Sequence, residues 1–201
     1  MEPLEFLTEG QVYEVLLVTR SNVTPVGVVR KGNRLFFKLF GGRSAEELKE
    51  HPYASIQVTN DAELLVKLGL NLPVSLEFAE GNRFRWVKGL PGFYGMVDIR
   101  EEPYEDDLGK TTVLACSLEP GGIIEGMLPP KPFSRADCAL VEMAVDLTRL
   151  IVAVKAGKRE PSLKLGRRIE ENYSLYLRFG GGSKTAERIV AWSRELLERI
   201  L

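Results

Sequence analysis

Residues 13–60 constrain the fold of this chain more than any other stretch of its sequence. Three apolar runs rich in Val, Leu and Phe follow one another with short polar stretches between them, at residues 15–18, 26–29 and 35–40. Such runs, separated by turn residues, predict consecutive antiparallel strands. We expect a short helix to begin at Ser44 and a fourth strand to follow at residues 54–59. This segment therefore predicts a β-meander that leads into a helix.

The pattern of short strands continues to about residue 120. Further strands are predicted at residues 74–79, 83–88, 94–100 and 111–118, and Gly81-Asn82 predicts a tight turn between the first two. Short antiparallel strands at this spacing favour a closed barrel or a sandwich. Pro and Gly residues then interrupt the chain at residues 120–122 and 128–132. We place a domain boundary there, with strands in residues 1–130 and helices in residues 131–201.

The second part has the pattern of three helices. Ser134 and Asp137 have the spacing of a helix cap, and residues 136–154 form an unusually apolar helix whose few charges lie along one stripe. We expect the other faces of that helix to be buried. Residues 163–179 and 183–201 predict two amphipathic helices. The glycines between them precede Ser183-Lys184-Thr185, which faintly resembles a P-loop; no strand precedes it, so we interpret it as a linker with Ser183 as N-cap.

The composition excludes several kinds of chemistry. The chain has one histidine, His51, and two cysteines far apart, Cys116 and Cys138, which argues against a zinc site, a disulfide framework and a His-based triad. No paired carboxylates stand at a fixed spacing. We therefore predict no metal, assign no catalytic residue, and expect any chemistry to reside on an organic cofactor.

No apolar run reaches the roughly 20 residues that span a bilayer, and the acidic start is unlike a signal peptide, so we expect a cytoplasmic protein without membrane contact.

The charges are divided unevenly along the chain. The first 130 residues are net acidic, whereas the rest is net basic and most basic in residues 155–168. Such asymmetry can mark nucleic-acid binding. Because no aromatic residues are interleaved with these cations, a solvated face or an interface is favoured over a nucleic-acid partner.

The turn at Gly41-Gly42-Arg43-Ser44 has two interpretations. Ser44-x-x-Glu47 fits a capping box, which needs no ligand, and the glycines would then simply allow a strand-to-helix turn. In contrast, a cation such as Arg43 just before a helix start is electrostatically misplaced unless an anion joins it. A phosphorylated ligand would suit such a turn, because free amides and the helix dipole both favour an anion. The local residues favour neither interpretation.

A resemblance to a known family covers both parts of the chain. Residues 18–61 resemble a little-characterised, mainly archaeal family of the FMN-binding split-barrel superfamily, whose barrels are similar to those of flavin reductases and pyridoxamine-phosphate oxidases. The matching features are Thr19 at the end of a strand, Pro25-x-Gly27, a charged hairpin, the run from Lys38 to Ser44, and the fourth strand. Arg135-Ala136 and Thr148-Arg149 resemble the two ends of the family's long apolar helix.

The resemblance implies the fold and the cofactor. It implies an α+β protein in which an antiparallel split β-barrel, residues 1–130, is followed by a helical domain, residues 131–201. It also implies a homodimer that binds FMN near the subunit interface. Arg43, Ser44 and the following amides would hold the phosphate, after the turn at Phe40 and Gly42. Thr19, Arg20 and Ser21 would lie along the edge of the flavin, while Pro25, Val26, Gly27 and Lys38 would flank the ring or the ribityl chain.

These observations lead to one functional hypothesis and two alternatives. The first is an FMN-binding protein that acts as a flavin-dependent oxidoreductase on an unidentified substrate, with a deazaflavin left open as the ring. The second is a non-catalytic module that binds flavin. The third is an interaction protein that uses its basic C-terminal helices.

Overall fold

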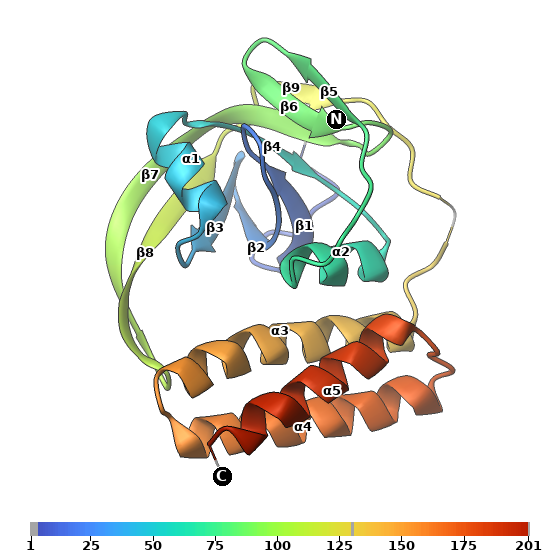
Figure 1. Cartoon of the computed structure of the whole chain (residues 1–201). Coiled ribbons are helices and arrows are strands. Elements are labelled where there is room, and N and C mark those ends of the chain that lie inside the picture. Colours follow the sequence, from blue (N-terminus) through green and yellow to red (C-terminus); the bar gives the residue numbers. More distant parts are fainter. Residues whose placement is uncertain (1–3, 130, 201) are drawn as a thin grey trace. The chain divides into compact units, whose positions relative to one another are not determined.

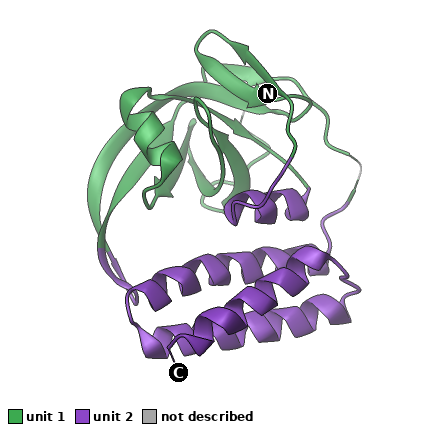
Figure 2. Cartoon of the chain, viewed as in Figure 1, with its two compact units in different colours: residues 1–60, 75–104, 111–131 green, residues 61–74, 105–110, 132–201 purple. Residues whose placement is uncertain are grey.

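The computed structural model describes residues 4–129 and 131–200, which form two compact units (Figure 2). Unit 1 comprises residues 1–60, 75–104 and 111–131, and unit 2 comprises residues 61–74, 105–110 and 132–201. The helical unit therefore includes two short pieces from the first part of the sequence. The division into a barrel domain, residues 1–130, and a helical domain, residues 131–201, stays a prediction.

Most of the described strands close into a barrel, and two others, at residues 78–81 and 84–87, pair in a separate two-stranded sheet (Figure 1). The described strands are β1 Val12–Val18, β2 Val23–Lys31, β3 Arg34–Leu39, β4 Tyr53–Gln57, β5 Phe78–Gly81, β6 Phe84–Val87, β7 Gly92–Asp106, β8 Gly109–Leu118 and β9 Gly122–Ile124. The main sheet has the order β4-β1-β2-β3-β8-β7-β9, and β4 also pairs with β7. That extra pairing joins the two sides of the sheet, so β1, β2, β3, β8, β7 and β4 form a closed antiparallel ring.

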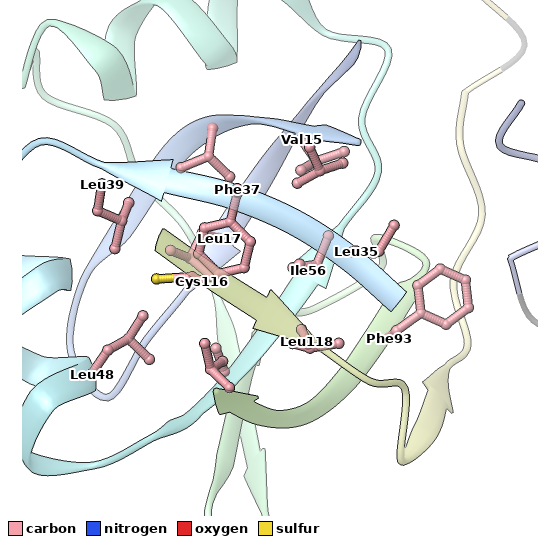
Figure 3. Packing of buried hydrophobic residues seen from close by; sticks show 14 of the residues in the cluster. Val15, Leu17, Leu35, Phe37, Leu39, Leu48, Ile56, Phe93, Cys116 and Leu118 are labelled. Atoms are coloured by element: carbon pink, nitrogen blue, oxygen red, sulfur yellow. The ribbon is translucent and has the colours of Figure 1, made fainter. Parts of the chain in front are cut away.

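The barrel core follows from alternation along the strands. In β3, Leu35, Phe37 and Leu39 are buried, whereas Phe36 and Lys38 between them are exposed. Figure 3 shows the three buried side chains packed with residues of β1, β4 and β8. The alternation directs Lys38 away from the core. This part of the sequence prediction is confirmed, because a period of two residues is a direct property of a pleated strand.

Several strand predictions in the barrel need correction. The strand predicted at residues 74–79 forms only as β5, Phe78–Gly81. The turn of that hairpin is Asn82-Arg83, with φ of 49° and 76°, rather than Gly81-Asn82. Strand β7 continues through residues 101–106, a stretch rich in Glu and Asp, because its residues pair with β8. The sequence prediction also missed β9, a three-residue strand.

Unit 2 consists of helices around a separate apolar core (Figure 1). Its helices are α2 Ala62–Gly69, α3 Arg135–Lys155, α4 Arg159–Arg178 and α5 Lys184–Glu198. Ser134 and Asp137 form the predicted capping box of α3, and Ser183 caps α5 by accepting from the Thr185 amide. The linker interpretation of the glycine-rich segment is thus confirmed. Together with α1 Arg43–Glu50 of unit 1, these helices and the antiparallel sheet confirm the predicted α+β class.

One charge on α3 departs from the prediction of a solvated stripe. Asp146 is fully buried, and its Oδ1 lies 3.1 Å from Nη2 of Arg168 on α4. Burial raises the pKa of the Asp146 carboxyl, although the guanidinium of Arg168 opposes that shift. The stripe prediction was wrong here because helical spacing alone does not show which charged residue meets a partner on another helix.

None of the helices in the described part of the chain combines the length and hydropathy needed to cross a bilayer.

Candidate functional site

The turn between β3 and α1 contains two glycines in left-handed conformations. Gly41 has a φ of 90° and Gly42 a φ of 83°, which residues with a side chain rarely adopt. Apart from the glycine itself and its two neighbours in the chain, no described heavy atom lies within 4 Å of the position that a Cβ would take on either glycine. The turn is therefore open on this side, and its path depends on glycine.

Helix α1 begins at Arg43, one residue earlier than predicted, with Gly42 as its N-cap. Glycine has no side chain that could accept a hydrogen bond from the first turn. Among the residues that the structure describes, no group accepts from the main-chain amides of Arg43 or Ser44. The helix start thus presents unpaired N–H groups together with the positive end of the helix dipole.

Ser44 is not the N-cap of α1, so the predicted capping box is wrong. Its side chain is buried, and its Oγ lies 3.0 Å from Asn22 Nδ2 and 2.8 Å from Thr24 Oγ1. Ser44 is the second residue of the helix, where its side chain cannot reach back to a first-turn amide. The serine instead joins α1 to the loop between β1 and β2 and to the start of β2.

Glu47, the acidic member of the predicted box, binds the same loop. One carboxylate oxygen accepts from Thr19 Oγ1 at 2.6 Å and from the Ser21 amide at 2.9 Å. The other accepts from the Ser21 hydroxyl and from Arg43 Nε, the latter at 3.0 Å. The carboxylate therefore receives four hydrogen bonds, which is the usual capacity of two ionised oxygens.

These bonds determine the ionisation of Glu47. Partial burial would raise the pKa of the carboxyl, but the hydrogen bonds from Ser21, Thr19 and Arg43 outweigh burial and lower the pKa from 4.5 to about 2. Glu47 is therefore ionised at neutral pH and cannot act as a general acid there.

Arg43 is held in place by two of its neighbours and is otherwise exposed. Its Nε donates to Glu47 and its Nη2 donates to Ser21 Oγ at 2.6 Å, while 65% of its side chain is accessible to solvent. A guanidinium ordered in this way, on the first residue of a helix whose first two amides are unpaired, is a suitable arrangement for an anion. Three of the predicted residues, Thr19, Ser21 and Arg43, are thus connected through Glu47, and Ser44 lies next to them.

The predicted residues of β2 and of the loop before it lie in different surroundings. The side chain of Val26 is in the barrel core, whereas Pro25 and Gly27 on either side of it are not buried. A contact from Val26 to a ligand would consequently come from its main chain. Arg20 is exposed and makes no hydrogen bond or ion pair within the described ranges.

Lys38 and Phe40 form a second cluster with Tyr104 of β7. Phe40 is 63% exposed and meets the Tyr104 ring edge-on at 5.0 Å between centroids, while Lys38 Nζ lies 5.1 Å from the centroid of the same ring. Such contacts order an exposed aromatic and a cation on one surface. The predicted site residues thus divide into a polar network at the start of α1 and an aromatic cluster at the end of β3.

Four residues of these clusters were missed by sequence reasoning: Asn22, Thr24, Glu47 and Tyr104. Asn22 stands in the same loop as Ser21, Thr24 follows at the start of β2, and Glu47 was considered only as a helix cap. A polar loop close in sequence to a site, and an acid one turn after a helix start, are the signals that could have identified three of them. Tyr104 lies in an acidic run far along the chain, and only the pairing of β8 with both β3 and β7 brings it near.

Nucleophilic chemistry finds little support in these residues. Cys116 is buried in the barrel core, and burial raises its thiol pKa to about 12, which disfavours the reactive thiolate. In the described part of the chain, no group of three His, Cys, Asp or Glu residues is arranged to hold a metal ion. The arrangement at the start of α1 is suited to binding an anion rather than to bond cleavage.

Unit 2 has a cavity of about 230 Å³ with charges of both signs. Its lining residues are Asp107, Leu108, Arg149, Glu160, Pro161, Lys164, Leu165 and Arg168. Arg149 lies 3.4 Å from Asp106 and Arg168 lies 3.1 Å from Asp146. Two of the cations are therefore used within this unit, which reduces the positive charge available to an external partner.

The fold and this site define a class of protein: an antiparallel β-barrel with an uncapped helix start, joined in sequence to a helical unit. The chain belongs to the family described as "Protein of unknown function (DUF447)". Its N-terminal domain model matches residues 13–124, and a second model of the family matches residues 134–191. The two matches together extend over both the strands and the C-terminal helices.

Two relatives are similar over most of the chain. "Uncharacterized protein MJ1453" from Methanocaldococcus jannaschii is 26% identical over 177 residues, which are 85% of this chain and 91% of that protein. The crystal structure of the FMN-bound DUF447 protein MM1853 from Methanosarcina mazei has a TM-score of 0.68 and 23% identity, over 95% of this chain and 97% of that one. The latter similarity establishes the shared fold.

Proposed function

We propose that this protein binds FMN through unit 1, with the phosphate at the start of α1. The observation that carries this proposal is the uncapped helix start, where the amides of Arg43 and Ser44 are unpaired and the Arg43 guanidinium is held by Glu47 and Ser21. The fold shared with the FMN-bound protein from Methanosarcina mazei supports flavin as the phosphorylated ligand.

The residues at the turn fit a phosphate monoester. Gly41 and Gly42 leave open space where other residues would place a Cβ, so an anion can approach the main chain closely. Arg43 offers charge-assisted hydrogen bonds from the guanidinium hydrogens that Glu47 and Ser21 do not use. Because the Ser44 hydroxyl is already bonded to Asn22 and Thr24, Ser44 would contribute its amide rather than its side chain.

The remaining predicted contacts concern the flavin ring. We propose that Thr19, Arg20 and Ser21 lie along its edge, and that Pro25, Gly27 and Lys38 flank the ring or the ribityl chain. The exposed Phe40–Tyr104 pair offers an apolar surface near the same turn. Split-barrel homodimers place a flavin near the subunit interface, and we propose that arrangement here; a cytoplasmic location stays a prediction.

The cofactor would supply the redox chemistry of a flavin, and the protein would bind and orient it. Because Glu47 is ionised and Cys116 is buried, neither offers a proton or a nucleophile at neutral pH. We therefore propose an oxidoreductase whose substrate is unidentified. Reduction of the bound flavin by NADH or NADPH with turnover to an acceptor would support it, whereas bound but inert flavin would favour a non-catalytic flavin-binding module.

A titration of the purified protein with FMN, followed by visible absorption, tests the binding step. We expect stoichiometric uptake by the wild-type protein and strongly weakened uptake by Arg43→Glu. Lys49→Glu is a matched control, because it makes the same charge change on the same helix but at its other end. Absence of FMN uptake by the wild type would refute the proposed function, and equal affinity of Arg43→Glu and Lys49→Glu would remove Arg43 from the site.

A further inference from the structure

Glu47 connects two segments that are far apart in the sequence but adjacent in the candidate FMN site. Its donors are Thr19 and Ser21 from the loop between β1 and β2, and Arg43 from the first turn of α1. Its side chain is only 15% exposed, which is low for an acid on a short surface helix. This arrangement differs from an ordinary i,i+4 ion pair, because three of the four hydrogen bonds come from another segment.

The network determines where the Arg43 guanidinium lies. Nε is bonded to Glu47, and Nη2 is bonded to Ser21 Oγ, whose own hydroxyl hydrogen goes to Glu47. Two of the three guanidinium nitrogens are therefore fixed on the side of the loop. The hydrogens that remain are on the exposed side of a side chain that would otherwise sample many rotamers.

We propose that Glu47 is a positioning residue for phosphate binding: it orders Arg43 and the Thr19–Ser21 loop so that the helix start receives a phosphate without a further cost of ordering. This inference rests on the proposed FMN-binding function and goes beyond it by assigning a role to an acid. Preorganisation of a binding group raises affinity by removing an entropic cost from the binding step.

The negative charge of Glu47 and the order that it imposes have opposite effects on phosphate binding. A carboxylate near a phosphate repels it, so a role in electrostatics alone would make its removal strengthen FMN binding. Ordering alone would make its removal weaken binding. Because the four donors already compensate the carboxylate and water screens the exposed side, we expect the loss of order to be the larger effect.

Glu46 provides the matched control. It precedes Glu47 in the first turn of α1, is exposed, and makes no side-chain hydrogen bond or ion pair in the described structure. Glu46→Gln therefore removes the same charge from the same helix turn and leaves the network intact. In contrast, Glu47→Gln keeps the shape of the side chain but places an amide donor among the donors of the network.

The test compares FMN and riboflavin, which lacks the phosphate, as ligands of wild-type protein, Glu47→Gln and Glu46→Gln. We expect Glu47→Gln to weaken FMN binding by about tenfold and riboflavin binding by only about twofold, because the loop at Thr19 and Ser21 serves the ring of both ligands whereas Arg43 serves only the phosphate. Glu46→Gln should bind FMN as tightly as the wild type or more tightly. A general loosening of the fold would weaken both ligands alike, so the ratio of the two affinities separates positioning from structural damage.

Unchanged or tighter FMN binding by Glu47→Gln would overturn the inference, and so would an equal loss for both ligands. If Glu47→Gln does not fold, Glu47→Asp takes its place, because it keeps the charge but is one methylene too short to reach every donor. The same selective loss for FMN is then expected, and wild-type affinity would refute the role. Failure of the wild type itself to bind FMN would instead refute the proposed function and is seen in the same experiment.

Discussion

Helices α1 and α3 have the same sequence pattern at their N-termini, but only α3 is capped by it. Ser44-x-x-Glu47 and Ser134-x-x-Asp137 both place an acid three residues after a serine. At α3 the pattern is a capping box, in which Ser134 Oγ accepts from the Asp137 amide at 3.0 Å and Asp137 accepts from the Ser134 amide at 2.8 Å. At α1 both side chains bind the β1–β2 loop instead.

The difference results from what precedes each serine. Residues 131–133 approach Ser134 as an irregular segment, and Ser134 itself has the extended backbone of an N-cap. Before Ser44, two glycines turn the chain so sharply that the helix begins at Arg43. The serine thereby moves inside the helix. The comparison shows that a serine and an acid three residues later can cap a helix start or leave it uncapped, depending on the turn before them.

The largest effect on FMN affinity should come from reversing the charge at the uncapped start of α1, which we call the open start; the capped start of α3 is the closed start. We expect Arg43→Glu to weaken FMN binding by several kcal/mol, because it removes a charge-assisted phosphate contact and adds repulsion. A reversal of charge at the closed start, Arg135→Glu at the first position of α3, should leave FMN affinity unchanged. Isothermal titration of both variants measures the difference. Similar losses for the two variants would contradict the distinction between the helix starts.

Substitutions of Ser44 and Ser134 should show that Ser44 is a buried hydrogen-bonding residue and Ser134 a helix cap. Ser44→Ala leaves the polar groups of Asn22 and Thr24 without this partner and should destabilise unit 1 by about 1–3 kcal/mol. Ser44→Gly should cost roughly 1 kcal/mol more, because glycine inside a helix is unfavourable. Urea unfolding of both variants provides the measurement. If glycine were tolerated better than alanine, Ser44 would behave as an N-cap and our assignment of its role would be wrong.

The pH dependence of stability should differ between wild type and Glu47→Gln. The folded-state pKa of Glu47 is about 2, below the ordinary value of 4.5, so its contribution is fully present above pH 4.5 and is lost as the pH falls toward 2. We expect Glu47→Gln to be less stable than the wild type by about 1–2 kcal/mol at pH 7, allowing for solvent screening, with the gap closing between those two values. A gap that does not change with pH would show that the carboxylate charge is not responsible.

The smallest effect should come from the closed start. Ser134→Ala should destabilise the helical unit by about 1 kcal/mol, whereas Ser134→Gly should cost only a few tenths, because glycine is itself an acceptable N-cap. Thermal unfolding followed by circular dichroism is sufficient to compare them. The order of alanine and glycine is thus expected to be opposite at Ser134 and Ser44. The same order at both serines would remove the contrast.

Much of this fold could be predicted from local sequence. The alternation of Leu35, Phe37 and Leu39 with exposed neighbours gives β3 directly, and Ser134 marks the start of α3. What could not be predicted depends on pairing between distant segments. Strand β7 extends to Asp106 only because β8 lies beside it, and Asp146 is buried only because Arg168 of another helix meets it.

The candidate site shows the same limit more sharply. Sequence reasoning selected Arg43 and the loop at Thr19 and Ser21, but it considered Glu47 only as the acid of one possible capping box, because Ser-x-x-Glu is a local pattern. The four hydrogen bonds of Glu47 span 26 to 28 residues except for that from Arg43. Only the fold brings these donors together. Contacts of the flavin ring from Pro25, Val26, Gly27 and Lys38 stay predictions for the same reason.

The most direct test of the account is a measurement at the two unpaired amides. In an NMR titration of ¹⁵N-labelled protein, FMN should cause large shifts of the Arg43 and Ser44 amide resonances, and riboflavin should shift them much less. The amides of Asp137 and Thr185, which are already capped, should not respond to the phosphate. Binding of FMN that leaves the Arg43 and Ser44 amides unchanged would contradict the central claim that the open start of α1 receives the phosphate.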